Sequence, residues 1–223
     1  MVPALAHIRN WIFDLDNTLY PSSADLFALI DARMGEYIGG LLGVDRIAAR
    51  KVQKDYFHAH GTTLAGLMAD HQVDPHEFLR FVHDVPMDRL VPDHRVIDGI
   101  ARLPGRRIVF TNGDASYAAR VLDKLGLGDL FETIYDIHLL DYRPKPYAEG
   151  YERMCAALGI AAPESLFVED MARNLVPAKA LGMTTVWVNN GSEQAGADAR
   201  SDLIDYITAD LGDWLDHVLA KGE

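Results

Sequence analysis

Two aspartates, Asp14 and Asp16, follow the apolar run 11–13 and are separated by a single residue. An apolar run without a turn residue is typical of a strand buried on both faces of a parallel sheet. Ligands bind to such sheets just beyond the carboxyl ends of the strands, where both aspartates are expected to lie. Because neighbouring buried carboxylates are costly unless a cation or a proton neutralises them, the pair predicts a metal site. The alternative is that they only begin a loop or cap a helix, which is a common role of aspartate.

Two further apolar strands are predicted, and each also ends in polar residues. The first, 107–111, leads into Asn112 and Gly113, and the second, 165–170, ends in two acids. Because the carboxyl ends of parallel strands lie at one edge of a sheet, these groups should gather in one crevice with the two aspartates. Lys145 precedes the next predicted helix and can join them.

The side chains expected in this crevice suit phosphoryl transfer. A carboxylate can attack phosphorus and form an acyl phosphate, which divides a hydrolysis into two displacements. Asp14 is the predicted nucleophile, and Asp16 is the predicted acid that protonates the leaving alkoxide and later deprotonates water. Mg²⁺ prefers a few carboxylates and water, so Asp14 and Asp170 are predicted ligands, with Glu169 either a further ligand or a residue behind them.

The other polar residues of the crevice suit an anion. The hydroxyl of Thr111 and the backbone N–H groups of Asn112 and Gly113, which lead into a helix N-terminus, form a predicted cradle for phosphoryl oxygens. Lys145 supplies a compact positive charge that offsets the charges of the nucleophile and of the transferring phosphoryl group.

These residues match four motifs in order: Asp-Leu-Asp-Asn-Thr at 14–18, Thr-Asn-Gly at 111–113, Lys-Pro at 145–146 and Glu-Asp at 169–170. The chain thereby resembles the haloacid dehalogenase (HAD) superfamily over nearly its whole length. The resemblance implies Asp14 as nucleophile, Asp16 as acid and base, and Mg²⁺ bound by Asp14, the backbone carbonyl of Asp16, and Asp170. Because the dehalogenase branch lacks the second aspartate, Asp16 implies phosphoryl transfer.

Four segments, 13–21, 61–67, 110–114 and 168–170, are similar to the pyrimidine 5′-nucleotidase branch of that superfamily. This resemblance implies a phosphatase acting on a nucleoside 5′-monophosphate, with UMP and CMP preferred to AMP, GMP and glycolate phosphate. The chain departs from the branch at Glu169, where relatives often carry an aspartate, and this puts the geometry of the metal site in doubt. Two alternatives stay open: a sugar-phosphate mutase of the same fold, and a HAD-like binding protein without catalysis.

The order of predicted elements indicates the fold class. Alternating strands and helices predict an α/β fold with a doubly wound, mostly parallel sheet, which the resemblance identifies as a Rossmann-like HAD core. Residues 22–90 show only helical periodicity and predict an inserted all-helical cap domain, so the core domain comprises 1–21 and 91–223. The predicted helices are 26–43, 45–61, 62–71, 74–84, 96–103, 114–126, 146–159, 171–182 and 210–219. A further strand is predicted at 184–188 and a weaker one at 131–137, and 189–199 is a predicted loop.

The cap must select the leaving group, because the core residues contact only phosphate and metal. Thr62 and Thr63 lie in a turn between two predicted cap helices, where their hydroxyls either hydrogen-bond a base edge or ribose or cap the following helix. His60 is a candidate donor to the substrate. Tyr20 either packs beneath the cap or stacks on a substrate ring.

A basic group at helical spacing also lies in the predicted cap: Arg46, Arg50, Lys51 and Lys54. Such a group is typical of a solvated helix face. The alternative is a positive wall that attracts the substrate phosphate.

Composition limits the partners. The formal charge of −12 argues against binding of a nucleic acid polymer or an anionic membrane, and a single cysteine is typical of a reducing compartment. No targeting pattern or membrane-length apolar run is present, so a cytoplasmic location is expected. The expected partner is a small-molecule phosphomonoester, and the oligomeric state stays open.

Overall fold

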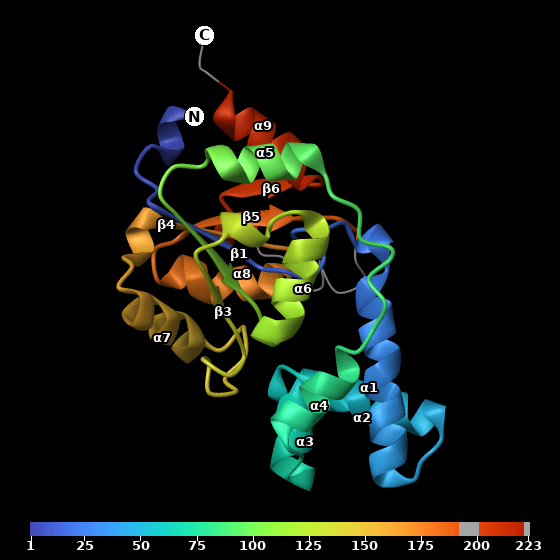
Figure 1. Ribbon diagram of the computed structural model, residues 1–223. Coiled ribbons are helices and arrows are strands. Elements are labelled where there is room, and N and C mark those ends of the chain that lie inside the picture. Colours follow the sequence, from blue (N-terminus) through green and yellow to red (C-terminus); the bar gives the residue numbers. More distant parts are fainter. Residues whose placement is uncertain (192–200, 221–223) are drawn as a thin grey trace.

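The computed structural model describes residues 1–191 and 201–220. Its core is a six-stranded sheet in the order β3-β2-β1-β4-β5-β6, in which every neighbouring pair is parallel (Figure 1). The strands are β1 (Asn10–Phe13), β2 (Arg106–Phe110), β3 (Thr133–Tyr135), β4 (Ser165–Glu169), β5 (Thr184–Val188) and β6 (Tyr206–Thr208). The predicted doubly wound α/β fold is confirmed.

Strand β1 lies between β2 and β4 at the centre of the sheet, and all four of its residues are buried. Phe13 pairs with Val109 of β2 on one side and with Val168 of β4 on the other. The residues that follow these three positions therefore leave the sheet side by side. This register brings the polar ends of β1, β2 and β4 to one place.

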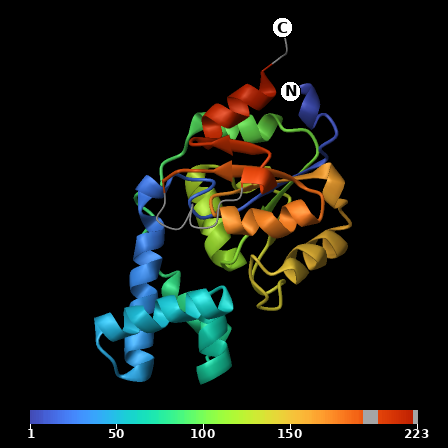
Figure 2. The ribbon, with the colours of Figure 1, turned by 180° about the vertical axis from the view of Figure 1, so that it is seen from behind.

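Helices cover both faces of the sheet. Helix α6 lies on one face and α7 and α8 lie on the other, as the two opposite views show (Figures 1 and 2), and α5 packs against the C-terminal helix α9. The core helices are α5 (His94–Arg102), α6 (Ala115–Leu125), α7 (Ala148–Leu158), α8 (Ala172–Ala180) and α9 (Leu211–Leu219). Short 3₁₀ helices span Pro3–Leu5, Ser22–Ala24, Gly128–Leu130, Ala162–Glu164 and Ser201–Leu203.

Four helices lie apart from the sheet and pack on one another: α1 (Leu26–Leu42), α2 (Arg46–His60), α3 (Thr63–His71) and α4 (Pro75–Val82) (Figure 1). Their apolar faces form a small core, in which Tyr37 meets the rings of Phe78 and Phe81 edge to face. Helix α1 ends at Gly43, whose φ of 64° suits glycine, and the carboxylate of Asp45 caps α2. The four helices fall within 22–90, but the domain boundaries themselves stay a prediction.

Ring contacts are among those that join these four helices, called the cap below, to the core. The guanidinium of Arg173 in α8 lies 4.3 Å from the centre of the Phe57 ring in α2. The rings of His76 in α4 and His138, which follows β3, are stacked with their centres 4.3 Å apart. The cap therefore rests on the edge of the sheet where the strands end.

Three elements differ clearly from the sequence prediction, and one of them is β3, which spans Thr133–Tyr135 instead of 131–137. Strand β6 was not predicted, because its three residues are too few for a period-two pattern to stand out. Helix α7 begins at Ala148 and not at Pro146, since Tyr147 has extended backbone angles. Most of the predicted loop 189–199 lies outside the described residues. In the described ranges, the helices are all too short or too polar to cross a bilayer.

Candidate active site

Three buried carboxylates meet where β1 and β4 end. Oxygens of Asp14, Glu169 and Asp170 all lie within 4.8 Å of one another. The three residues are 7%, 1% and 4% exposed, so little water screens their charges. Burial raises the pKa of Asp170 well above its usual value, and the neighbouring charges of Glu169 and Asp14 raise it further. A cation at this place would relieve that repulsion.

Lys145 is the counter-charge of this cluster. Its side chain is 1% exposed, and Nζ donates to Oδ1 of Asp14 (2.6 Å), Oε2 of Glu169 (2.7 Å) and the carbonyl of Phe110 (2.9 Å). Burial alone would lower the pKa of Lys145, but the two carboxylates outweigh burial and raise it. The lysine is therefore held as a cation beside Asp14, in the position that the sequence predicts.

Asn112 has a role that the sequence did not reveal. Its side-chain amide donates to the carbonyl of Lys145 (3.1 Å), and its Oδ1 accepts from the Lys145 backbone N–H (2.8 Å). This paired contact attaches the loop before α7 to the end of β2. Asn112 thus holds Lys145 in place, in addition to any contact that its own backbone N–H makes with a ligand.

Glu169 is enclosed by donors. Oε2 accepts from Lys145, and Oε1 accepts from Nδ2 of Asn174 (2.8 Å) and the N–H of Met171 (3.3 Å). Burial, followed by the charge of Asp14, raises the pKa of Glu169 to about 7 against the opposing effect of Lys145. With three donors on its two oxygens and an exposure of 1%, against 7% for Asp14, Glu169 fits the role of a residue behind the metal ligands better than that of a ligand.

Asp16 lies beside the cluster and lines the cavity, and two phenols contact it. The hydroxyls of Tyr20 and Tyr117 each donate to Oδ1 at 2.6 Å. Burial, and next the charge of Asp14, raises the pKa of Asp16, while the two phenols act in the opposite direction. Burial and the charge of Asp16 raise the pKa of both phenols well above the usual value, so both stay hydrogen-bond donors.

Tyr20 is 3% exposed and does not line this cavity, so its position favours the packing alternative over stacking on a substrate ring. Tyr117 was missed by sequence reasoning. It lies on the buried side of α6 with Val121, and its helical spacing indicates only core packing. Nothing in the local sequence shows that its hydroxyl reaches Asp16, 101 residues away.

Thr111 and Gly113 lie at the end of β2 and line the cavity. Oγ1 of Thr111 accepts from the N–H of Gly113 (2.9 Å), which leaves the hydroxyl hydrogen available to a ligand. The Gly113 N–H is already used within the chain, so the expectation that it faces a phosphate finds no support in this structure. Thr111 remains a candidate donor.

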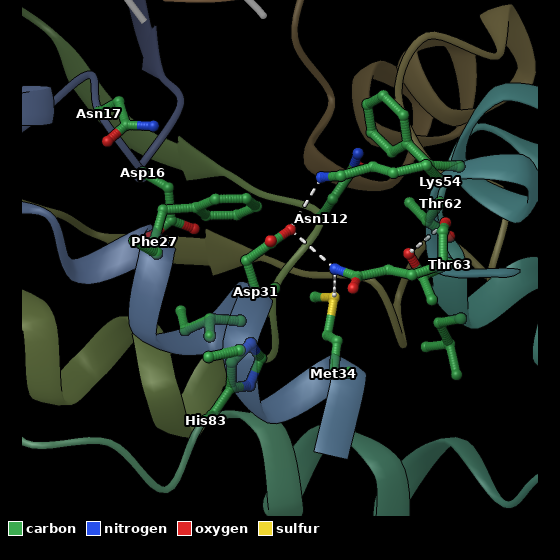
Figure 3. Close-up of a pocket in the computed structure, with 18 of the residues that line it drawn as sticks. Asp16, Asn17, Phe27, Asp31, Met34, Lys54, Thr62, Thr63, His83 and Asn112 are labelled. Atoms are coloured by element: carbon green, nitrogen blue, oxygen red, sulfur yellow. Dashed lines mark hydrogen bonds and ion pairs between the residues drawn. The ribbon is translucent and has the colours of Figure 1, made fainter. Parts of the chain in front are cut away.

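A cavity of about 1040 Å³ lies between the core and the cap. The core contributes Asp14, Asp16, Thr111, Lys145 and Asp170, so the predicted catalytic residues share one chamber. The cap contributes side chains of α1, α2 and α3, several of which are drawn in Figure 3. The chamber is therefore lined both by the predicted catalytic residues at the strand ends and by the cap residues that would select a leaving group.

The predicted cap residues Thr62, Thr63 and His60 differ in whether they line the cavity. The hydroxyls of Thr62 and Thr63 are used within the cap: Thr62 accepts from the N–H of Ala65 (3.1 Å) as the N-cap of α3, and Thr63 donates to the carbonyl of Gln53 (3.2 Å). Both still line the cavity (Figure 3). His60 does not line it, and its ring packs edge to face on Tyr56. The expectation that His60 donates to the substrate finds no support in this arrangement.

The basic group of α2 points largely into the cavity. Arg46, Arg50 and Lys54 line it, whereas Lys51 is 76% exposed and pairs with Asp55 on the outer side. Lys51 fits the interpretation as a solvated face, and Arg50 is also 59% exposed although it lines the cavity. Arg46, Arg50 and Lys54 together make one wall of the cavity positive, which favours the alternative that this wall attracts the substrate phosphate.

Asp31 of α1 faces this wall and is its main counter-charge (Figure 3). Its carboxylate accepts from Nη1 of Arg50 (2.6 Å), Nε2 of Gln53 (2.7 Å) and Nζ of Lys54 (2.9 Å). Sequence reasoning missed Asp31 and Gln53, because each reads as a single polar residue in an amphipathic helix. Together they make a polar cluster in the cap wall, referred to below as the Asp31 cluster (Asp31, Arg50, Gln53 and Lys54).

The chain is similar to known proteins along most of its length. It is 26% identical to phosphate metabolism protein 8 of Saccharomyces cerevisiae over 189 residues, which are 78% of this chain and 59% of the yeast protein. It is 27% identical to a phosphoglycolate phosphatase of Neisseria gonorrhoeae, with 86% of this chain and 84% of that protein covered. It is 26% identical to a validoxylamine A 7′-phosphate phosphatase of Streptomyces hygroscopicus subsp. limoneus, over 86% of this chain and 91% of that protein.

Solved structures share the fold. A HAD phosphatase from Thermococcus onnurineus superposes with a TM-score of 0.64 at 20% identity, covering 96% of this chain and 98% of that chain. An L-2-haloacid dehalogenase from Xanthobacter autotrophicus superposes with a TM-score of 0.58 at 20% identity, covering 96% and 100%. Residues 8–182, which include Asp14, Asp16, Thr111, Lys145, Glu169 and Asp170, match the family described as haloacid dehalogenase-like hydrolase. The chain therefore belongs to the haloacid dehalogenase-like hydrolase family.

Proposed function

We propose that the protein is a Mg²⁺-dependent phosphatase that hydrolyses a small phosphomonoester through a phosphorylated Asp14. The observation that carries this proposal is the meeting of Asp14, Asp16, Lys145 and Asp170 at one wall of the cavity between core and cap. Phosphatases among the sequence relatives support it. The non-enzymatic alternative is disfavoured, because the groups that the chemistry requires are present together.

The donor set fits a hard divalent cation. Three buried carboxylates, those of Asp14, Glu169 and Asp170, lie beside the Lys145 ammonium group, and Asp16 lines the same cavity. Carboxylate oxygens are the ligands that Mg²⁺ prefers. Asp14, Asp170 and the backbone carbonyl of Asp16 would hold the ion. When bound, Mg²⁺ would polarise the phosphoryl oxygens and offset their charge.

The protein's own groups would then act in two steps. A carboxylate oxygen of Asp14 attacks phosphorus, the bond from phosphorus to the ester oxygen breaks, and Asp16 gives its proton to the departing oxygen. A water molecule next gives a proton to Asp16 and attacks phosphorus, which releases phosphate and restores the Asp14 carboxylate. Lys145 stays protonated in both steps and stabilises the charge that develops beside Asp14.

Mg²⁺ is expected to stabilise the fold, and Asp170→Asn should remove this response. A saturating ion at 100 times its Kd adds about 2.7 kcal/mol, or roughly 5–10 °C in Tm for a chain of this length. In EDTA the variant should melt above the wild type, because one of the mutually repelling buried charges is gone. Thermal melts with EDTA and with Mg²⁺ test both statements, with the exposed Asp129→Asn as the control for loss of one charge. An unchanged Mg²⁺ response in Asp170→Asn would rule out Asp170 as a ligand.

We propose a nucleoside 5′-monophosphate, UMP or CMP, as the substrate. The motif resemblance supports this, and the cavity of about 1040 Å³ has room for a nucleotide. We assign recognition of the leaving group to the Asp31 cluster instead of His60, Thr62 and Thr63. The Asp31 carboxylate and the donors bound to it can hydrogen-bond ribose hydroxyls or a base edge. A second candidate is glycolate phosphate, which the neisserial relatives are named for and whose carboxylate would suit Arg46, Arg50 and Lys54.

Asp31→Asn separates the two candidate substrates by the sign of its effect. If Asp31 accepts from a nucleotide, the variant should raise the KM of UMP by about tenfold, the value of one lost charge-assisted hydrogen bond. If Arg50 and Lys54 bind a substrate carboxylate, removing their counter-charge should lower the KM of glycolate phosphate. Hydrolysis of p-nitrophenyl phosphate should not change in either case.

The experiment is a side-by-side assay of UMP, CMP, AMP, GMP and glycolate phosphate with Mg²⁺. Asp55→Asn is the matched control, because Asp55 also pairs with a lysine of α2 but on the outer side. A preference for glycolate phosphate, or a loss shared by every substrate, would contradict the nucleotide assignment and leave the phosphatase. A sugar phosphate added to the same assay tests the mutase, which would form a sugar bisphosphate from it.

A further inference from the structure

The carboxyl group of Asp16 is held from one side. Tyr20, four residues further along the chain, and Tyr117, from α6 in the core, both donate to the same oxygen, Oδ1, at 2.6 Å. Within the described parts of the chain, Oδ1 is the only oxygen of this carboxyl that accepts a hydrogen bond. The two phenols do not line the cavity, whereas Asp16 does. The donors therefore approach from behind and leave Oδ2 for a ligand.

The ring of Tyr117 is in turn fixed by His83. The two rings are stacked, with centres 4.2 Å apart and planes 13° apart. Nδ1 of His83 lies 3.1 Å from Oδ2 of Asp114, whose other oxygen accepts from the backbone N–H of Tyr117 (2.8 Å). Hydrogen bonds from His83 and from that N–H outweigh burial and lower the pKa of Asp114 to about 2. Tyr117, His83 and Asp114 thus form a closed set of contacts.

His83 stands where the chain leaves the cap. It is the residue that caps the C-terminus of α4, and its carbonyl accepts from Nη2 of Arg120 in α6 (2.6 Å). The segment that leads from the cap back to the core is therefore anchored on the same helix that carries Tyr117. A displacement of this segment would remove the stacking partner of the phenol that contacts Asp16.

We propose that Tyr20 and Tyr117 are positioning residues that fix Oδ1 of Asp16 so that Oδ2 faces the leaving oxygen, and that His83 makes this orientation depend on the seating of the cap segment. The proposal rests on the proposed function in one respect, the role of Asp16 in proton transfer. The tyrosines keep their own protons throughout.

The physical reason is the freedom of a carboxyl group. Rotation about the last torsion of an aspartate is broad, so without the two donors the group would sample many orientations. Short hydrogen bonds to a carboxylate are among the strongest in proteins and restrict it to one. Proton transfer requires a heavy-atom distance of about 2.6–3.2 Å, so loss of orientation slows this transfer more than it weakens substrate binding.

Leaving groups of different basicity separate this role from a structural one. The alkoxide of UMP needs a proton as it departs, whereas dinitrophenolate from 2,4-dinitrophenyl phosphate does not. General acid catalysis contributes about 10²–10⁴-fold, so Tyr117→Phe should slow the release of uridine by about 10–100-fold and the release of dinitrophenolate by less than about threefold. KM should stay nearly constant. Tyr20→Phe should show the same selectivity, and the double variant a larger one.

The measurement is the pre-steady-state burst of leaving-group release, which reports on the phosphorylation step alone. Tyr135→Phe is the matched control, since Tyr135 is also buried and its hydroxyl donates only to a backbone carbonyl, that of Leu139. In an Asp16→Ala background, Tyr117→Phe should have no further effect on dinitrophenyl phosphate or UMP, because two residues that act as a unit are not additive. His83→Ala should reproduce the selectivity of Tyr117→Phe, and His83→Phe, which keeps an aromatic ring, should reproduce it more weakly.

Each outcome decides a separate question. Equal losses on both phosphates, or no loss, would overturn the positioning role of the tyrosines. A selective Tyr117→Phe with an unselective His83→Ala would overturn only the link to the cap segment. If the wild type is active and Asp14→Asn is inactive, these results bear on the inference alone. A wild type that hydrolyses neither phosphate would overturn the proposed function and this inference with it.

Discussion

An Asp14→Asn variant is expected to lose roughly 10⁴-fold or more of the wild-type kcat while remaining folded. The amide has nearly the shape of the carboxylate but lacks the charge that attacks phosphorus. Oδ1 and Oδ2 of Asp14 accept from Lys145 (2.6 Å) and Thr18 (3.1 Å), and Lys145 keeps Glu169 as a partner after the change. Folding is therefore expected to survive, and a far-UV circular dichroism spectrum and thermal melt would check this.

The same residue should carry the covalent intermediate. Quenching the wild type during turnover and reducing the acyl phosphate with borohydride should convert Asp14 to homoserine, and beryllofluoride should inhibit by mimicking the aspartyl phosphate. Peptide mapping locates the modified position. Retention of more than about a tenth of the wild-type rate by Asp14→Asn would contradict covalent catalysis through this residue, since loss of a nucleophile has a far larger effect. Labelling of another residue would contradict it too.

Lys145→Met is expected to have a second large effect, on stability as well as rate. Removing one partner of a buried ion pair costs about 3–5 kcal/mol, because the remaining charges have no compensation. Here Asp14 and Glu169 would both lose the ammonium group, in a place where Lys145 and Glu169 are each 1% exposed. Urea unfolding in EDTA measures the loss in the free energy of unfolding.

A double variant separates stability from catalysis. Lys145→Met with Glu169→Gln removes one positive and one negative charge, and the amide oxygen of the introduced glutamine can still accept from Asn174 and Met171. The double variant should regain much of the lost stability but little of the activity, because no cation remains beside Asp14. A single variant as stable as the wild type, or a double variant with restored turnover, would contradict this division of roles.

The fold and the core of the site could be predicted from sequence because they depend on local patterns. The apolar runs before Asp14, Asn112 and Asp170 predict buried parallel strands, and strand direction alone then brings their ends to one edge of the sheet. Lys145 could also be assigned to the site from sequence, because it directly precedes a predicted helix. The four-helix cap followed from periodicity in the same way, with capping residues such as Asp45 in their expected places.

The sequence by itself thus determined which carboxyl ends of strands meet at one edge of the sheet, whereas the tertiary structure decided which side chains contact one another there. Tyr117 reaches Asp16, Asn112 holds the backbone of Lys145, and Arg50 and Lys54 of α2 pair with Asp31. His60 carries a suitable group in the predicted segment, yet the rotation of α2 places it outside the cavity. Periodicity defines an apolar side for each helix, but the polar contacts of that helix depend on its rotation and on the neighbours packed against it. Those neighbours come from distant parts of the chain, so only the packed structure specifies the residues around Asp16 and the lining of the chamber.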